Sequence, residues 1–311
     1  MTSIAAPRTQ PARHASDLAL AAFAPASWGT TYVVTTTLLP ADRPMLAATL
    51  RALPAGLVLL AATRRLPRGS WWWKSAVLGM LNFGAFFPLL FFAAYRLPGG
   101  VAATVGSVQP LVVALLSLGV LRVRPARAVL YSALAGTGGV ALLTLTSDAR
   151  LDPLGIAAML TATSLMAAAI VLAKKWGRPE SPLVMTGWQL TVGGLVLLPL
   201  TLLTEGVPPS VTGENVLGFA YLGIVGTAIA YALWFRGIDR LAPTSVSLLG
   251  LTNPMVATLA GLLVLGQTLT FWQLVGFTIA LGALVAGQSF NRKPAPALEA
   301  PVPLPQPAGR L

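Results

Sequence analysis

Long apolar runs, separated by short polar or basic segments, recur along the chain. The runs fall at residues 18–39, 44–63, 72–95, 99–121, 127–146, 153–174, 184–203, 215–236, 243–265 and 270–289. Each is close to the ~20 residues that an α-helix needs to cross the hydrocarbon core of a bilayer. The pattern therefore predicts an all-α integral membrane protein with ten transmembrane helices.

Composition and charge agree with a membrane protein. Hydrophobic residues make up 55% of the chain, charged residues 10%, and the mean hydropathy is +0.75, which is too apolar for the surface of a soluble globule. The net charge of +12 would otherwise suggest nucleic acid, but the basic residues are not gathered in one module. The predicted partners are the lipid bilayer and a small-molecule substrate, with no nucleic acid.

The basic residues also predict an orientation. If the N-terminus is cytoplasmic, seventeen of the 21 Lys and Arg residues lie in inner segments, three lie in outer loops, and Arg51 lies within a span. Cytoplasmic loops carry such an excess of Lys and Arg. Both termini are therefore predicted to be cytoplasmic.

The two halves of the chain resemble each other. Residues 51–60 and 189–198 align without a gap, and both segments end in Gly-Leu-Val-Leu-Leu. The pairs Gln109-Pro110 and Asn253-Pro254 also occupy matching places in the two halves. The residues before them align at the same sequence offset. An odd number of crossings in each half would insert the halves in opposite orientations. We therefore expect two inverted five-helix repeats.

This repeat sets the expected domain organisation. A cytoplasmic tail precedes the first repeat, and a Pro- and Ala-rich stretch that is typical of disorder follows the second. The expected parts are a tail at 1–16, repeats at 17–146 and 147–290, and a disordered cytoplasmic tail at 291–311.

Gln109 and Asn253 each precede a proline inside a span. Such a proline frees a backbone carbonyl one turn earlier and kinks the helix. The amide side chain can satisfy the kink, or it can line a path through the protein. Both interpretations fit the sequence.

Polar and aromatic residues within the spans indicate where a path would run. Trp28 and Tyr32 lie one helical turn apart, as do Asn82 and Phe86, so each pair shares a helix face. Thr227, Tyr231 and Trp234 form a third stripe. Such residues can be core or lipid-facing, or they can bind a ligand. The predicted substrate-binding residues are Trp28, Tyr32, Asn82, Phe86, Gln109, Ser164 (at the place of Trp28 in the second half), Thr227, Tyr231 and Asn253.

Arg51 has two interpretations. It lies seven residues from Pro44, or ~10 Å deep at 1.5 Å per residue. At that depth its side chain can extend to the outer surface near Asp42 in a structural role. Alternatively, it holds a substrate carboxylate or forms an outer gate.

The spans lack several kinds of reactive group. His14 is the only histidine and lies in the N-terminal tail, and the chain has no cysteine. No metal site, cofactor site or catalytic triad is expected, so the protein is predicted not to be an enzyme. No Asp, Glu or Lys lies clearly within the middle of a span, which argues against a proton relay and favours transport down a gradient.

Several short motifs resemble a known superfamily. The segments 27–32, Leu50-Arg51, Gln109-Pro110-Leu111 and 249–254 resemble the bacterial drug/metabolite transporter superfamily, EamA type. The resemblance covers about residues 17–290 and is greatest to a branch that exports aromatic and other apolar amino acids. One departure is Gln267 after Gly266, where the family commonly has glutamate, so no role of that acid is carried over.

The resemblance implies a function. It implies an alternating-access transporter of the bacterial inner membrane that exports apolar or aromatic amino acids and related small metabolites or drugs between its two halves. Two alternatives remain: a sugar-phosphate or nucleotide-sugar carrier on the same fold, which would need more basic residues in its cavity, and a channel, which would need a continuous wet lining.

Overall fold

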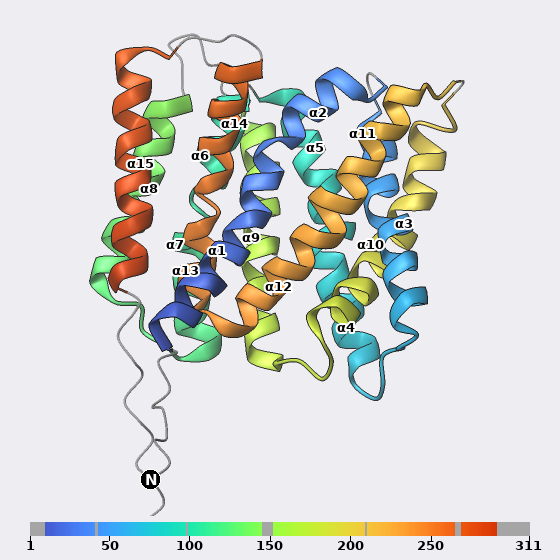
Figure 1. Ribbon diagram of the computed structural model, residues 1–311, viewed down its shortest axis with the longest axis horizontal. Helices are drawn as coiled ribbons and strands as arrows, with labels where there is room; N and C mark the ends of the chain where they lie inside the picture. Colours follow the sequence, from blue (N-terminus) through green and yellow to red (C-terminus); the bar gives the residue numbers. More distant parts are fainter. Residues whose placement is uncertain are drawn as a thin grey trace, which may run out of the picture.

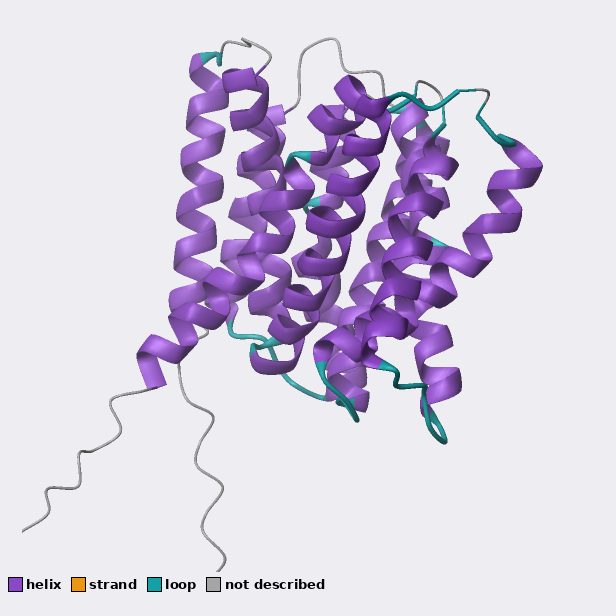
Figure 2. Ribbon diagram, turned by 45° about the vertical axis from the view of Figure 1, so that its right-hand side comes forward, coloured by secondary structure: helices purple, strands orange, loops and turns teal. Residues whose placement is uncertain are grey.

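The computed structural model describes residues 10–40, 43–97, 99–144, 152–208, 210–264 and 269–290. All regular secondary structure in these ranges is helical (Figure 2). Residues 1–9 of the expected N-terminal tail and all of 291–311 lie outside them. The first helix begins at Gln10 and so includes part of the expected tail.

The helices follow the expected apolar runs. The first half holds α1 (Gln10–Gly29), α2 (Thr31–Leu38), α3 (Pro44–Thr63), α4 (Trp71–Gly79), the π-helical segment η1 (Met80–Gly84), α5 (Phe86–Arg96), α6 (Gly99–Gly106), α7 (Gln109–Leu116), the π-helical segment η2 (Ser117–Leu121) and α8 (Arg127–Thr144). The second half holds α9 (Pro153–Trp176), α10 (Pro182–Thr204), α11 (Gly213–Gly223), the π-helical segment η3 (Ile224–Ile229), α12 (Ala230–Arg240), α13 (Pro243–Leu249), α14 (Thr252–Val264) and α15 (Phe271–Phe290).

Local sequence signals explain where several helices begin. Proline occupies the first turn of α3, α9, α10 and α13, where its missing N–H costs nothing. The carboxylate of Asp152 accepts a hydrogen bond from the amide of Leu154 at 2.9 Å and caps α9. Gly177, with φ of +67°, follows the end of α9 in a conformation that other residues rarely adopt.

The helices form one bundle with its long axes roughly parallel in Figure 1. At one side α15 lies along α8, and at the other side α3 lies along α10. The contact between α3 and α10 is very close, since a Cβ on Gly194 would lie 2.6 Å from the Cα of Leu53. The aligned segments 51–60 and 189–198 therefore pack against each other, as small residues at a membrane helix interface allow.

The two ends of the bundle differ in charge. Helix α1 begins and α15 ends at the lower end in Figure 1, which also carries Arg65, Lys174, Arg178 and Arg240. We call this the basic end. The opposite end carries Asp152, Glu205 and Glu214, together with Arg43 and Arg96.

Large apolar side chains cover much of the bundle's outer surface. Leu203 is 83% exposed, and Leu115, Leu263 and Phe271 are also exposed. Contiguous apolar surface of this kind is suited to lipid rather than to water. Within the described ranges, seven helices are long and apolar enough to cross a membrane, and Arg127–Leu143 is a shorter apolar helix. The all-helical membrane architecture is confirmed, while the count of ten crossings and the inversion of the two halves stay predictions.

Candidate functional site

Two π-helical segments occupy matching places in the two halves. The starts of η1 and η3 are separated by the same offset as Gln109 and Asn253. A π-helical turn adds a residue to the helix and is frequent at functional sites. Here η1 carries Asn82 and η3 carries Thr227, whose exposed fractions are 1% and 0%. Each segment therefore brings a predicted site residue into the interior.

Arg51 contacts the π-helical segment of the other half. Its Nε donates a hydrogen bond to Oγ1 of Thr227 at 3.4 Å, and its guanidinium carbon lies 5.4 Å from the centre of the Phe87 ring. The residue is only 6% exposed. The expected extension toward the outer surface is therefore wrong, because the helix packing leaves this side chain an inward path between α3, η3 and α5.

The charge of Arg51 has no anionic partner in the described residues. The five ion pairs of that part of the chain involve other basic residues. A buried cation without a counter-charge is costly, and a guanidinium presents a planar set of donors that matches a carboxylate. The site is therefore suited chemically to an anionic group of a ligand.

Gln189 makes the matching contact from the second half. Its Oε1 accepts a hydrogen bond from Nδ2 of Asn82 at 2.9 Å, and both side chains are buried. Gln189 aligns with Arg51. Helix α3 of the first half therefore contacts η3 of the second half, and α10 of the second half contacts η1 of the first half. The internal repeat aligns Gln189 with Arg51, but Gln189 is not among the predicted substrate-binding residues.

An aromatic cluster centres on Tyr231 of α12. The Tyr231 ring lies 4.8 Å from that of Trp28, 4.6 Å from that of Phe83 and 5.8 Å from that of Phe235, measured between ring centres. Trp28 also contacts Trp234 at 5.3 Å. The cluster joins both halves of the chain, because α1 and η1 meet α12 there. Trp28 and Tyr231, two of the predicted substrate-binding residues, are thus brought together, while their binding role stays a prediction.

A hydrogen bond ties Trp28 to the second π-helical segment. Its Nε1 donates to the backbone oxygen of Gly226 in η3 at 2.9 Å. A π-helical turn disturbs the regular ladder of backbone hydrogen bonds, so a side-chain donor at this carbonyl stabilises it. Trp28 itself is half-buried, which leaves part of its ring accessible.

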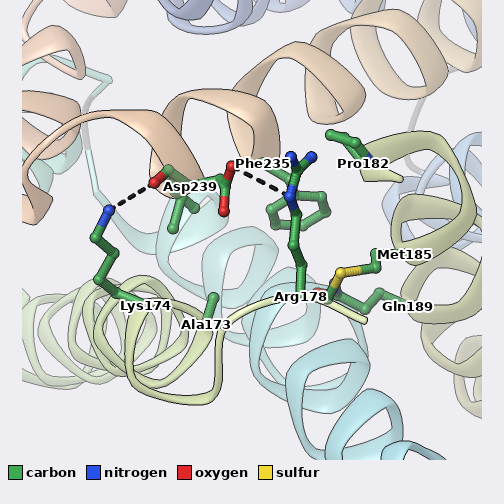
Figure 3. Close-up of a pocket in the computed structure, with 10 residues that line it drawn as sticks. Ala173, Lys174, Arg178, Pro182, Met185, Gln189, Phe235 and Asp239 are labelled. Carbon is green, nitrogen blue, oxygen red and sulfur yellow. Dashed lines mark hydrogen bonds and ion pairs between the residues drawn. The ribbon is translucent and has the colours of Figure 1, made fainter. Parts of the chain in front are cut away.

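A pocket opens near the basic end between α9, α10 and α12 (Figure 3). Its volume is about 110 Å³. Lys174 and Arg178 lie to either side of Asp239 in Figure 3 and both contact it, while Phe235 and Gln189 are among the other lining residues. The complete lining is Ala173, Lys174, Gly177, Arg178, Pro182, Met185, Gln189, Phe235, Ile238 and Asp239.

A row of side chains along η3 and α12 connects this pocket with Arg51. Thr227, Tyr231, Phe235 and Asp239 follow one another at intervals of four residues, so each lies about one helical turn from the next. Thr227 contacts Arg51, Tyr231 lies in the aromatic cluster, and Phe235 and Asp239 line the pocket. The predicted stripe ends at Trp234; continuing from Tyr231 at intervals of four residues would have found Phe235 and Asp239.

The two amide-proline pairs lie at matching helix breaks. Helix α6 ends at Gly106 before Gln109 begins α7, and α13 ends at Leu249 before α14 begins. The predicted interruptions of both spans are confirmed. Oε1 of Gln109 would lie 3.5 Å from a Cβ on Gly250, so this amide packs against the other break. In the described residues, no hydrogen bond joins Gln109 or Asn253 to the aromatic cluster, and their binding role stays a prediction.

The remaining predicted substrate-binding residues are Phe86, Ser164 and Tyr32. Phe86 is half-buried, and its ring centre is 5.7 Å from that of Phe87. Ser164 is exposed on α9, and the side chain of Tyr32 lies outside the described part of the structure. Their roles stay predictions. Trp72 and Trp272, near the starts of α4 and α15, are 57% and 63% exposed.

These features define a class of protein. An apolar helical bundle, with an interior cation and an aromatic cluster shared by its two halves, is a multi-pass membrane protein. The model of the EamA-like transporter family matches the chain twice, over residues 16–145 and 153–286. The chain therefore belongs to the EamA-like transporter family, and the resemblance noted in the sequence is confirmed. It is a membrane transporter.

Relatives and a solved structure agree with this assignment. Protein PecM of Dickeya dadantii (strain 3937) is 49% identical over 271 residues, covering 86% of this chain and 91% of PecM. An uncharacterized transporter of Bacillus subtilis (strain 168), YwfM, is 25% identical over 86% of this chain and 91% of its own length. A solved crystal structure has a TM-score of 0.76 at 22% identity, covering 89% of this chain and 98% of that one, and shows the fold alone.

Proposed function

We propose that this transporter exports amino acids with apolar or aromatic side chains, and related small metabolites or drugs, across the bacterial inner membrane by alternating access. Both termini lie in the cytoplasm in this proposal, because the basic end carries most of the Lys and Arg residues. Transport follows the substrate gradient. The proposal places the substrate between Arg51 and the aromatic cluster.

The observation that carries the proposal is a buried arginine without an anionic partner in the described residues, beside an aromatic cluster. A substrate carboxylate would form a charge-assisted pair with the Arg51 guanidinium, near the Thr227 hydroxyl. The apolar side chain of the substrate would contact the rings of Phe87 and Tyr231. Its ammonium group would be stabilised over an aromatic face.

Contacts between the halves occur at both ends and support alternating access. At the opposite end, Arg96 pairs with Asp152 at 3.1 Å, and the Glu205 carboxylate accepts hydrogen bonds from two amides at the start of α3. At the basic end, Arg65 pairs with Glu180 at 3.3 Å. The exposed ion pairs at either end contribute little stability, so they can separate at small cost. The pocket beside Phe235 supports access from the basic end in this conformation.

Comparison of Arg51 variants with matched substrates tests the proposal. Purified protein in liposomes would be assayed with labelled tryptophan and with tryptamine, which lacks the carboxylate. Arg51→Gln removes the charge and introduces the residue type of the aligned position 189. Loss of a charged hydrogen bond costs ~1.5–3 kcal/mol, so tryptophan transport should fall roughly 10- to 150-fold. Tryptamine transport should change little.

Two controls make the result specific. Arg65→Gln removes a cation whose side chain is 56% exposed in a surface ion pair, and it should leave both rates nearly unaltered. A nucleotide-sugar, which the alternative carrier would favour, should not be transported. Equal loss of tryptophan and tryptamine transport in Arg51→Gln would show that Arg51 supports the fold rather than the carboxylate.

A further inference from the structure

The pocket at the basic end carries an excess of positive charge. Nζ of Lys174 donates to the backbone oxygens of Asp239 at 2.6 Å and Leu241 at 3.1 Å (Figure 3). Arg178 pairs through Nε with Oδ2 of Asp239 at 3.2 Å. Arg178 therefore pairs with the only carboxylate of the pocket lining, while Lys174 is held by neutral carbonyls. A small anion at this mouth would complete the charge balance.

The inner wall of the same pocket is apolar. Phe235, Met185 and Ile238 line it together with Ala173. A cavity of about 110 Å³ is of the order of the ~150 Å³ engineered cavities that hold benzene, and this pocket is also open on one side. It has room for a small ring or a branched side chain. The pocket thus places apolar contacts behind a cationic mouth.

Phe235 separates the pocket from the aromatic cluster. Its ring lines the pocket and also lies 5.8 Å from the Tyr231 ring, centre to centre. Gln189 lines the pocket as well and contacts Asn82 farther in. A ligand in the pocket is therefore one aromatic layer away from the site at Tyr231.

We propose that this pocket is a second binding site, an access site for carboxylates with an apolar side chain, which holds the carboxylate at Lys174 and Arg178 and the side chain against Phe235. The assignment rests on the proposed function for its role in transport, but binding in the pocket does not depend on Arg51. The access site would collect substrate at the basic end before it passes Phe235 to the aromatic cluster.

Binding at the pocket can be followed separately from transport. The chain has seven methionines, and Met185 lines the pocket. The full chain, labelled with [¹³C-methyl]methionine in nanodiscs, would be titrated with benzoate, and the Met185 signal assigned with Met185→Leu. The benzoate ring should shift the Met185 methyl resonance with a saturating midpoint. Absence of a saturable shift in the parent protein would overturn the proposal.

Variants that remove a positive charge and a variant that removes a negative charge should shift the benzoate midpoint in opposite directions. Lys174→Gln and Arg178→Gln should each raise the benzoate midpoint roughly five- to tenfold, because each removes an attractive charge from the mouth. Asp239→Asn removes the only carboxylate of the pocket lining and should lower the midpoint severalfold. A misfolded variant cannot bind more tightly, so this reversal separates electrostatics from damage. Unchanged midpoints in all three variants would overturn the assignment.

Further controls define the ligand class and separate the two sites. Lys175→Gln, an exposed neighbour outside the pocket lining, and Arg51→Gln should leave the Met185 midpoint within about twofold. Benzyl alcohol and inorganic phosphate should bind much more weakly than benzoate. Equal binding of either would overturn the assignment to an apolar carboxylate. If Arg51→Gln leaves tryptophan transport intact while the Met185 shift persists, the proposed function fails and the access site stands.

Discussion

Replacement of Trp28 by alanine tests whether the aromatic cluster contacts substrate. The Trp28 ring is half-buried and lies 4.8 Å from Tyr231 and 5.3 Å from Trp234. If substrate buries an apolar side chain against it, the lost contact is worth ~1–3 kcal/mol, and transport should weaken roughly ten- to a hundredfold. The assay is saturable uptake of labelled tryptophan into liposomes with purified variants at matched protein content.

The same substitution also removes structural contacts, and their size can be estimated. Each aromatic pair contributes ~0.5–1.5 kcal/mol and the hydrogen bond to Gly226 contributes ~1 kcal/mol. The melting temperature of Trp28→Ala should therefore fall. Trp28→Phe keeps a ring but removes the Nε1 donor, so it should lower stability while retaining most of the substrate contact. The difference between these two variants isolates the ring from the hydrogen bond.

Trp72→Ala provides the matched control. Trp72 is 57% exposed at the basic end, and it should anchor the bundle at the membrane surface without touching substrate. Tyr231→Ala should behave like Trp28→Ala, with a larger loss of stability because Tyr231 is 2% exposed. Equal transport loss in the Trp28, Tyr231 and Trp72 variants, or none in the first two, would refute the placement of the substrate among these rings.

Other predictions address topology, coupling and stability. Because the chain lacks cysteine, a single cysteine introduced at Arg65 should be shielded from impermeant thiol reagents in intact cells, while one at Glu214 is labelled; labelling of both would contradict the inverted topology. An imposed pH gradient should change tryptophan flux little, and uphill accumulation in liposomes would reveal a proton relay. Glu205→Ala removes the acceptor of two amides at the start of α3 and should cost ~1 kcal/mol in thermal unfolding, unlike Glu214→Ala. The hydrogen bond from Arg96 holds the pKa of Asp152 below its ordinary value, so its stabilisation is present at neutral pH and is lost as pH falls through the lowered pKa; Asp152→Asn should remove that acid-range change in melting temperature.

Helix positions and breaks could be predicted from the sequence, for clear physical reasons. Membrane helices must be long and apolar, and a proline inside one interrupts its hydrogen bonds. The apolar runs therefore located the helices, and Pro110 and Pro254 located the two broken spans. Shared helix faces also follow from spacing alone, which is why the sequence predicts one stripe for Thr227 and Tyr231.

Side-chain directions inside the bundle could not be predicted in the same way. Arg51 has an outward and an inward path, and the choice depends on the position of Thr227, which is distant in sequence. The π-helical segments could not be predicted either, because one added residue within a long, mostly apolar run leaves no periodic signal in the sequence. The pocket depends on Lys174 meeting Asp239, 65 residues away, so neither residue alone indicates it.

The two halves are alike in their contacts but differ in charge. Arg51 and Gln189 occupy aligned positions and each contacts the other half's π-helical segment, yet only Arg51 is a cation. Because α3 and α10 are antiparallel, with Leu53 beside Gly194, Gln189 lies ~10 Å closer to the basic end than Arg51. A substrate moving inward from the pocket would therefore pass a neutral amide pair, and its carboxylate would have to turn from the mouth of the pocket toward the buried guanidinium. Under the proposed function, this difference orients the substrate with its carboxylate away from the basic end and its apolar side chain toward Tyr231 and Phe235.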